Sequence, residues 1–162
     1  MHTSTTSTAT LVPWTAEQLK DATQGQWHND KVPSGEIKRI LTDSREAELG
    51  DAFLALKGER FDAHAFIAHV ATQGCDLAIV SQPIDADICQ LVVDDTRFAL
   101  GRLGAYRRQQ NPQLKVIALT GSSGKTTTKE MLGSILKRIA PTLITRGNLN
   151  NDLGVPMMLL EL

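Results

Sequence analysis

The chain has 162 residues, of which 41% are hydrophobic and 22% charged, a composition ordinary for a soluble globular protein. Its formal net charge of −1 gives no general attraction to nucleic acid or to an anionic membrane, so we expect neither as a partner. The two cysteines, Cys75 and Cys89, have no metal-binding or redox spacing, and the chain shows no export signal. Reduced, structural thiols in a cytoplasmic protein are therefore predicted.

Residues 1–13 are predicted to form a disordered tail, because the opening MHTSTTSTAT is a low-complexity Ser/Thr stretch. It has neither the basic segment nor the apolar segment of a signal peptide. Order is expected to begin at Trp14. Thr15 stands three residues before Gln18 in the arrangement of a capping box, which predicts a helix over about 15–23.

Strands and helices alternate in the next part of the chain, as far as residue 112. Apolar runs and alternation predict strands in EIKRILTDSR (36–45), DAFLAL (51–56), DLAIV (76–80) and CQLVVDD (89–95). Helical spacing predicts a helix that starts near Phe66 and ends at Gly74, and another over 96–110. Asn111-Pro112 breaks the second helix, so 14–112 is predicted to be an α/β domain.

The remaining residues, 113–162, predict the start of a second α/β domain. KVIALT (115–120) reads as a buried strand, GSSG (121–124) as a tight turn, and 125–139 as an amphipathic helix. TLIT (142–145) reads as a further strand, and a last helix is expected after Pro156. This order is a first βαβ unit, and because about 50 residues do not complete a nucleotide-binding domain, we expect a truncated one.

The turn at 121–124 has the features of a phosphate-binding loop. A strand leads into it and a helix follows, so that free N–H groups at the helix start point at an anion. Gly121 and Gly124 permit positive φ, the Lys125 ammonium can reach terminal phosphates, and the Thr126 hydroxyl can bind Mg²⁺. The alternative is a glycine-serine turn with a solvated lysine. Predicted ATP contacts are Gly121, Ser122, Ser123, Gly124, Lys125, Thr126 and Thr127, with Lys125 and Thr126 as the catalytic pair.

The loop is shorter than the usual pattern, because its first glycine lies four rather than six residues before the lysine. LTGSSGKTTTKEM resembles the T-G-[ST]-[NS]-G-K-[ST]-[ST] loop of the Mur ligase superfamily, ATP-dependent enzymes that form amide bonds. The block 42–80 resembles the N-terminal domain of the members that take UDP-N-acetylmuramoyl-peptides, with Cys75 at a position usually occupied by alanine. A P-loop ATPase domain that follows a UDP-substrate domain is the architecture that this resemblance implies.

Ser44 and Arg45 carry the resemblance in the first domain. A hydroxyl and a guanidinium fork after a strand can bind diphosphate or uracil oxygens. The alternative for Asp43-Ser44-Arg45, which the tripeptide alone favours, is an exposed turn with a surface ion pair. His64 and His69 lack the spacing of metal ligands on one helix face, and a structural role is predicted for both.

The segment TRGNLNNDLGVPMMLLEL (145–162) resembles the G-N-x-N-N-x-x-G-x-P segment of family members that use D-alanyl-D-alanine. Asn148, Asn150 and Asn151 are implied to contact the UDP-substrate through uncharged amides, although three turn-forming asparagines are the alternative.

The resemblance therefore implies a bacterial, cytoplasmic, monomeric ligase that joins D-alanyl-D-alanine to UDP-N-acetylmuramoyl-tripeptide with ATP and Mg²⁺. The isolated chain is expected to be inactive. Two alternatives remain at this stage: another amino-acid ligase of the same superfamily, and a non-catalytic module that binds a nucleotide or a UDP-sugar.

Overall fold

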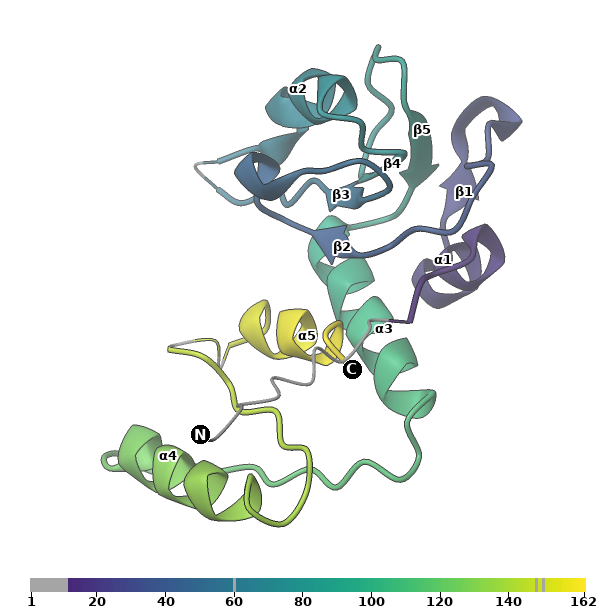
Figure 1. Cartoon of the computed structure of the whole chain (residues 1–162). Coiled ribbons are helices and arrows are strands. Elements are labelled where there is room, and N and C mark those ends of the chain that lie inside the picture. Colours follow the sequence, from purple (N-terminus) through teal and green to yellow (C-terminus); the bar gives the residue numbers. More distant parts are fainter. Residues whose placement is uncertain (1–11, 60, 148, 150) are drawn as a thin grey trace, which may run out of the picture.

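A five-stranded sheet lies at one end of the protein, in the upper part of Figure 1. The computed structural model describes residues 12–59, 61–147, 149 and 151–162. The strand order is β1-β5-β4-β3-β2, and all neighbours are parallel except β1, which pairs antiparallel with β5. The strands are β1 (Gln26–Trp27), β2 (Ile40–Leu41), β3 (Ala52–Leu54), β4 (Leu77–Val80) and β5 (Cys89–Val92).

Helices cover both faces of this sheet and extend away from it. The described helices are α1 (Ala16–Thr23), α2 (Ile67–Thr72), α3 (Thr96–Gln109), α4 (Lys125–Leu136) and α5 (Gly154–Leu159), with short 3₁₀ helices η1 (His28–Asp30), η2 (Ser44–Glu46) and η3 (Ala63–Phe66). The longest of them, α3, has 14 residues, and none of the described helices has the length and apolar character that a membrane crossing requires. The predicted α/β class is confirmed.

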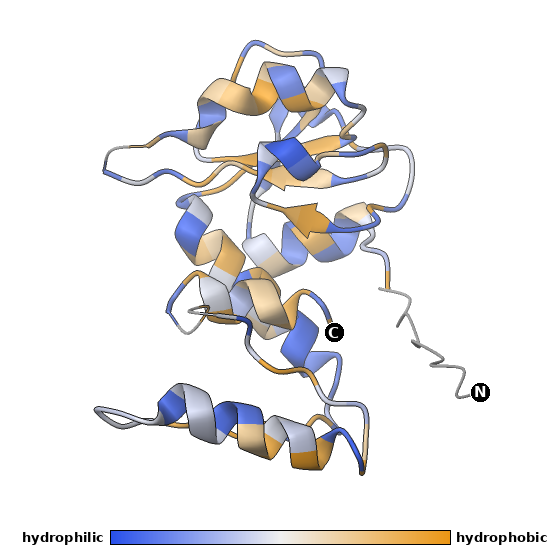
Figure 2. Ribbon diagram, turned by 60° about the vertical axis from the view of Figure 1, so that its left-hand side comes forward, coloured by the Kyte–Doolittle hydropathy of each residue, from blue (hydrophilic) through white to orange (hydrophobic). Residues whose placement is uncertain are grey.

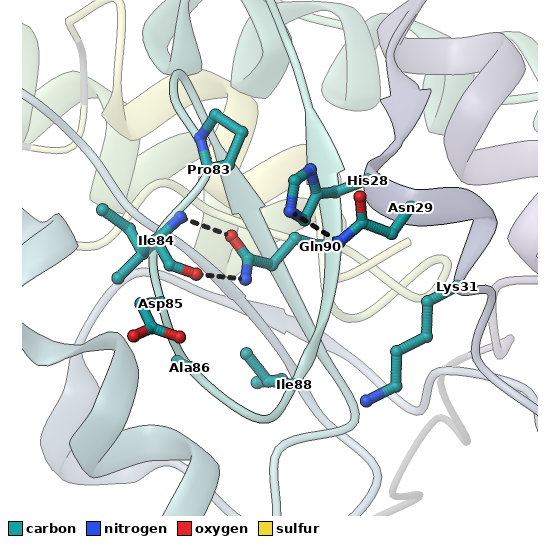
Figure 3. A pocket seen from close by; sticks show the side chains of 9 residues that line it. All are labelled: His28, Asn29, Lys31, Pro83, Ile84, Asp85, Ala86, Ile88 and Gln90. Carbon is teal, nitrogen blue, oxygen red and sulfur yellow. Dashed lines mark hydrogen bonds between the residues drawn. The ribbon is translucent and has the colours of Figure 1, made fainter.

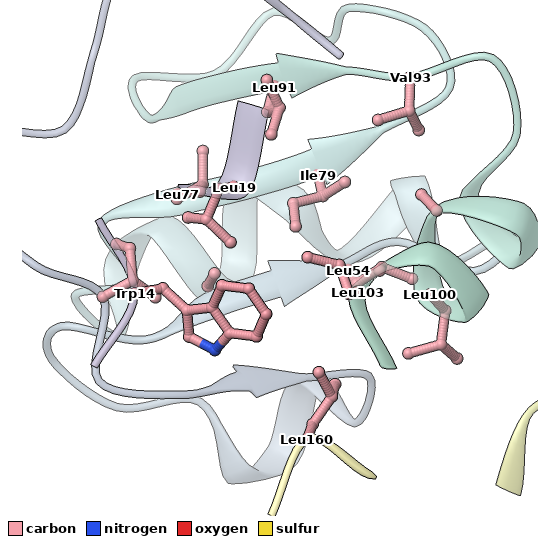
Figure 4. Packing of buried hydrophobic residues seen from close by; sticks show 13 residues of the cluster. Trp14, Leu19, Leu54, Leu77, Ile79, Leu91, Val93, Leu100, Leu103 and Leu160 are labelled. Carbon is pink, nitrogen blue, oxygen red and sulfur yellow. The ribbon is translucent and has the colours of Figure 1, made fainter. Parts of the chain in front are cut away.

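Alternation along the strands divides the core between the two faces of the sheet. In β4, Leu77 and Ile79 face α1 and α3, whereas Ala78 and Val80 face α2. The α3-side core is drawn in Figure 4 and includes Trp14, Leu19, Leu54, Leu77, Ile79, Leu91, Leu100 and Leu103. The α2-side core includes Phe53, Ala55, Ala63, Ile67, Val70, Ala78 and Val80. Burial on both faces explains why β3 and β4 are continuous apolar runs.

Side-chain caps fix the starts of two predicted helices. The capping box of α1 is present, since Gln18 N donates to Thr15 Oγ1 (3.2 Å) and Thr15 N donates to Gln18 Oε1 (3.0 Å). Asp95 caps α3 by accepting from the backbone N–H groups of Arg97 (2.7 Å) and Phe98 (3.0 Å). These contacts satisfy N–H groups that have no intrahelical partner.

The strands predicted at 115–120 and 142–145 are not formed, which corrects the expected βαβ unit. The helix between them, α4, is present, but it stands away from the sheet (Figures 1 and 2). Val116 and Ile117 are 62% and 59% exposed. A parallel strand needs neighbours to pair with, and the apolar segment at 115–120 makes no strand pairing in the described structure. The same isolation leaves two apolar residues of the predicted amphipathic helix, Met131 and Ile135, exposed.

The last helix, α5, packs on α3 and so returns to the first part of the fold (Figure 1). It begins at Gly154, earlier than predicted, with Pro156 in its first turn, where proline is tolerated. Met158 is buried, and Leu160, just after the helix, belongs to the α3-side core. The division into domains 14–112 and 113–162 stays a prediction, and residues 1–11 of the predicted tail lie outside the described part of the chain.

Candidate functional site

The glycine-serine turn adopts the backbone conformation that the sequence predicted for a phosphate loop. Gly121 has φ = 143° and Gly124 has φ = 75°, both in the range that favours glycine. Gly124 is the N-cap of α4, and Thr128 N donates to its carbonyl (2.9 Å), which closes the first helical turn. The N–H groups of the first residues of a helix have no intrahelical partner, so α4 presents its positive end at this loop.

The side chains of the loop face solvent. Ser122, Ser123, Thr126 and Thr127 are exposed, and Lys125 is half-buried at the start of α4. The Lys125 ammonium donates to the carbonyl of Gly121, which curls its side chain back over the loop. A single anion bound at the loop would therefore meet a cation, hydroxyls and helix N–H groups within one helical turn.

A groove of about 1140 Å³ lies beside β2, at the edge of the sheet. Its other side is formed by α5 and by residues that precede and follow this helix. Ser44 and Arg45, at the start of η2 directly after β2, lie along one side. Arg146 and Met157 lie along the other. The structure thus brings the two predicted UDP-substrate residues of the first domain together with the predicted substrate segment 145–162. None of the phosphate-loop residues lines this groove.

Arg45 forms an ion pair within its own turn. Its Nε donates to Asp43 Oδ1 (2.9 Å), and Asp43 Oδ1 also accepts from the Arg45 backbone N–H (3.0 Å). The Arg45 hydrogen bonds lower the pKa of Asp43 to about 2. The Arg45 side chain is 86% exposed, so it holds this surface ion pair while remaining accessible from the groove. The exposed turn with a surface ion pair, which the sequence left open as the alternative for Asp43-Ser44-Arg45, describes the geometry of these residues.

Only one of the three predicted asparagines can be assigned a contact. Asn151 Oδ1 accepts from Gly154 N (2.8 Å) and so stabilises the turn that leads into α5. This is the turn-forming role that composition suggested. Asn148 and Asn150 lie outside the described residues.

The two histidines, His64 and His69, lie in different environments, and no cluster of three metal-binding side chains occurs among the described residues. His64 is buried and fully hydrogen-bonded, as the predicted structural role requires, whereas His69 is exposed on α2. Both cysteines are free thiols. Burial raises the pKa of Cys75 to about 11, which disfavours its reactive thiolate and fits a structural thiol.

A second, smaller hollow of about 370 Å³ lies between η1 and the loop before β5 (Figure 3). Its buried polar side chain, Gln90, accepts from Ile84 N (2.9 Å) and donates to Ile84 O (2.7 Å). Gln90 therefore holds the loop before β5 in place, with both polar atoms of its amide hydrogen-bonded to Ile84.

The comparisons with known proteins agree on one family. The model of the Mur ligase middle domain matches residues 119–162. The UDP-N-acetylmuramoyl-tripeptide–D-alanyl-D-alanine ligase of Escherichia coli K12 is 47% identical over 152 residues, which cover 94% of this chain and 33% of the relative. The corresponding Haemophilus influenzae ligase is 48% identical over 134 residues, covering 78% and 29%.

A crystal structure of MurF from Acinetobacter baumannii has 78% identity and a TM-score of 0.92, and it covers 95% of this chain and 34% of that one. The chain belongs to the Mur ligase family. A MurF structure from Thermotoga maritima in complex with ADP has 34% identity and a TM-score of 0.64, covering 75% and 28%. This Mur ligase chain spans about a third of the length of the curated relatives it matches.

The resemblance predicted from the loop, from block 42–80 and from the asparagine segment is thereby confirmed as membership of the family. The individual site residues of this Mur ligase chain stay predictions.

The sequence did not single out some residues that line the groove of this Mur ligase chain. Arg39 lies there and is bound by the buried Asp51 through Nε (3.0 Å to each carboxylate oxygen). Phe61 and Phe66 also line it, with ring centroids 5.8 Å apart and planes inclined by 27°. The scarcity of aromatic residues was the available signal, since they make up only 4% of the chain and these two flank Asp62-Ala63-His64 in the block 42–80.

Proposed function

We propose that this chain is the substrate-binding and ATP-binding part of a ligase of peptidoglycan precursor synthesis. The reaction joins D-alanyl-D-alanine to UDP-N-acetylmuramoyl-tripeptide and converts ATP to ADP and phosphate. The observation that carries the proposal is the loop with positive φ values, followed by Lys125 at the start of α4. It occurs in a chain that is 47% identical to the UDP-N-acetylmuramoyl-tripeptide–D-alanyl-D-alanine ligase of Escherichia coli K12. We also propose that the protein is a monomer of the bacterial cytoplasm.

In this proposal the loop 121–127 binds the phosphates of ATP. The N–H groups at the start of α4 and the Lys125 ammonium would neutralise the charge that develops on the transferred phosphoryl group. Gly121 and Gly124 allow the backbone to approach the phosphate oxygens.

Mg²⁺ fits the loop as a partner of bound phosphate. Thr126 supplies one exposed hydroxyl oxygen, a ligand type that Mg²⁺ accepts together with phosphate oxygens and water. The described residues offer no cluster of three carboxylate, histidine or cysteine side chains that would hold the ion without a nucleotide. When bound, Mg²⁺ would supply charge neutralisation at the phosphates.

The groove beside β2 is proposed to bind the UDP end of the other substrate. Ser44 offers a hydroxyl, and Arg45 offers a guanidinium that can exchange the Asp43 carboxylate for diphosphate oxygens. Asn148, Asn150 and Asn151 are proposed to approach the same substrate from the 145–162 segment.

A test of this assignment compares Arg45→Ala with Lys20→Ala, which removes an exposed cation from α1 away from the groove. In a protein extended to the length of the curated relatives, Arg45→Ala should raise the KM for the UDP-substrate about tenfold or more and leave the KM for ATP unchanged. Equal effects on both KM values would indicate misfolding instead.

The chemistry follows from the low reactivity of a carboxylate towards amines. The tripeptide carboxylate attacks the γ-phosphorus of ATP, which gives an acyl phosphate and ADP. The amine of D-alanyl-D-alanine then attacks the acyl carbon, phosphate leaves, and the amine loses a proton. The residues of this chain contribute by positioning and by charge neutralisation.

Release of ADP by the extended protein tests the proposal. ADP release should require both the UDP-tripeptide and the dipeptide. ADP release with a single amino acid in place of the dipeptide would favour another ligase of the superfamily. Binding of ATP without any turnover would favour a non-catalytic nucleotide-binding module.

A further inference from the structure

His64 uses both ring nitrogens to join two segments that are far apart in the sequence. Its Nδ1 lies 2.6 Å from Asp62 Oδ1. Its Nε2 accepts from the backbone N–H of Ser81 (3.0 Å), the residue that follows β4, and lies 3.2 Å from Ser81 Oγ. The side chain is 4% exposed, so these contacts are made in the interior.

The hydrogen bonds fix the tautomer of this ring. A backbone N–H can only donate, so Nε2 must carry the lone pair and the proton must sit on Nδ1, where it is donated to Asp62. The order Asp62, His64, Ser81 resembles a hydrolase triad. However, the single lone pair on Nε2 already accepts from the Ser81 N–H, so His64 has no free base with which to activate the Ser81 hydroxyl. The role of these hydrogen bonds is therefore structural. We refer to the contacts that join Asp62, His64 and Ser81 as the His64 latch.

The latch holds a hairpin that forms part of the groove. Lys57 pairs with Asp62 across the hairpin, and Gly58 N donates to Phe61 O (2.8 Å) at its turn. At the other end of this hairpin, η3 carries Phe66 to the same groove. Phe61 and Phe66 stack on each other and are 60% and 37% exposed, so they present an aromatic wall beside Ser44 and Arg45.

We propose that His64 is a positioning residue for this groove, because it ties the Phe61–Phe66 wall to the carboxyl end of β4. The inference rests on the proposed function, in which the groove binds a uridine diphosphate group. Without the ring, the hairpin would lose its attachment to Ser81, and the aromatic wall would no longer stay at a fixed distance from Arg45. Affinity for the nucleotide would then fall although His64 does not touch it.

The test uses the whole chain and UDP itself as the probe, titrated by calorimetry. His64→Leu removes both contacts of the ring, whereas His64→Gln keeps an acceptor that can reach the Ser81 N–H. His69→Gln, on the exposed face of α2, is the matched control. Hydrogen exchange at the Ser81 amide reports directly whether the latch is closed.

We expect His64→Leu to weaken UDP binding about tenfold and to expose the Ser81 amide to exchange, with ATP binding unchanged. His64→Gln should restore most of the affinity, and His69→Gln should match the parent chain. A latch that is only structural would lower the melting temperature of His64→Leu without changing UDP affinity measured well below that temperature. That result would overturn the inference. Failure of the parent chain itself to bind UDP would instead refute the proposed role of the groove.

Discussion

Two glycines on α3, Gly101 and Gly104, allow a matched test of whether α5 packs against α3. Gly101 has open space where a Cβ would lie, whereas a Cβ on Gly104 would lie 2.9 Å from Pro156 Cα and 3.1 Å from Pro156 Cβ. The obstacle at Gly104 includes backbone, which cannot move without shifting the helix. Gly101→Ala and Gly104→Ala therefore make the same chemical change in the same helix, with and without a neighbour.

The two substitutions are expected to change the free energy of unfolding differently. Gly101→Ala should stabilise the fold by about 0.5–1 kcal/mol, because alanine loses less backbone entropy in a helix. Gly104→Ala gains the same term but must displace α5, and overpacking of this kind costs about 1–3 kcal/mol. The free energies of unfolding of the two variants should differ by about 1–3 kcal/mol, or roughly 2–12 °C in melting temperature for a chain of this length.

Urea unfolding followed by circular dichroism, with a thermal melt as a second measure, would provide both values. We expect Gly101→Ala to be more stable than the parent chain and Gly104→Ala to be equally stable or less stable. If Gly104→Ala stabilised the protein as much as Gly101→Ala, α5 would not be packed on α3, and Arg146 and Met157 would not form one side of the groove.

Three further predictions concern the loop and one ion pair. Lys125→Ala in the extended protein should lower kcat by about 100-fold or more with an unchanged melting temperature, because the surrounding loop is exposed; near-normal turnover would contradict the loop assignment. The present chain alone should bind ATP weakly, because no strand supports the loop at 115–120, and a micromolar or tighter calorimetric constant would refute this. Hydrogen bonds from Arg102 lower the pKa of Asp94 in the folded protein to about 2. The ionised pair therefore stabilises the fold fully above the pKa of about 3.9 that Asp has in the unfolded chain, and this stabilisation is lost as the pH falls through about 2. Asp94→Asn should therefore melt below the parent chain at pH 6, with the difference closing between pH ~4 and ~2; a constant difference would show that the pair is not the cause.

The sequence predicted those elements whose determinants are local. The capping box of Thr15 and Gln18 and the break at Asn111-Pro112 act within a few residues, and both helices end or begin close to where these signals predict. The strands β4 and β5 were also predictable, because burial on both faces of the sheet favours apolar residues at most of their positions.

The errors arose where an element depends on distant partners. The segment 115–120 has the apolar character of a strand, but the sequence could not show whether a neighbouring strand would be present to pair with it. The strand β1 was missed because it has two residues and exists through its antiparallel pairing with β5.

In the candidate site, too, local features could be predicted and features that depend on distant residues could not. The loop conformation at Gly121 and Gly124 follows from local sequence, and the structure has the positive φ values that were expected. The groove could not be predicted in detail, since it depends on α5 folding back on α3 and on the latch between His64 and Ser81.

Analysis of the reaction product by mass spectrometry tests the central claim most directly. The extended protein would be incubated with UDP-N-acetylmuramoyl-tripeptide, ATP and Mg²⁺, with D-alanyl-D-alanine or single amino acids as competing amines. We predict a product that carries the whole dipeptide, formed together with one ADP for each amide bond. A product that carries a single amino acid, or no amide product while ATP remains bound, would contradict the proposed function.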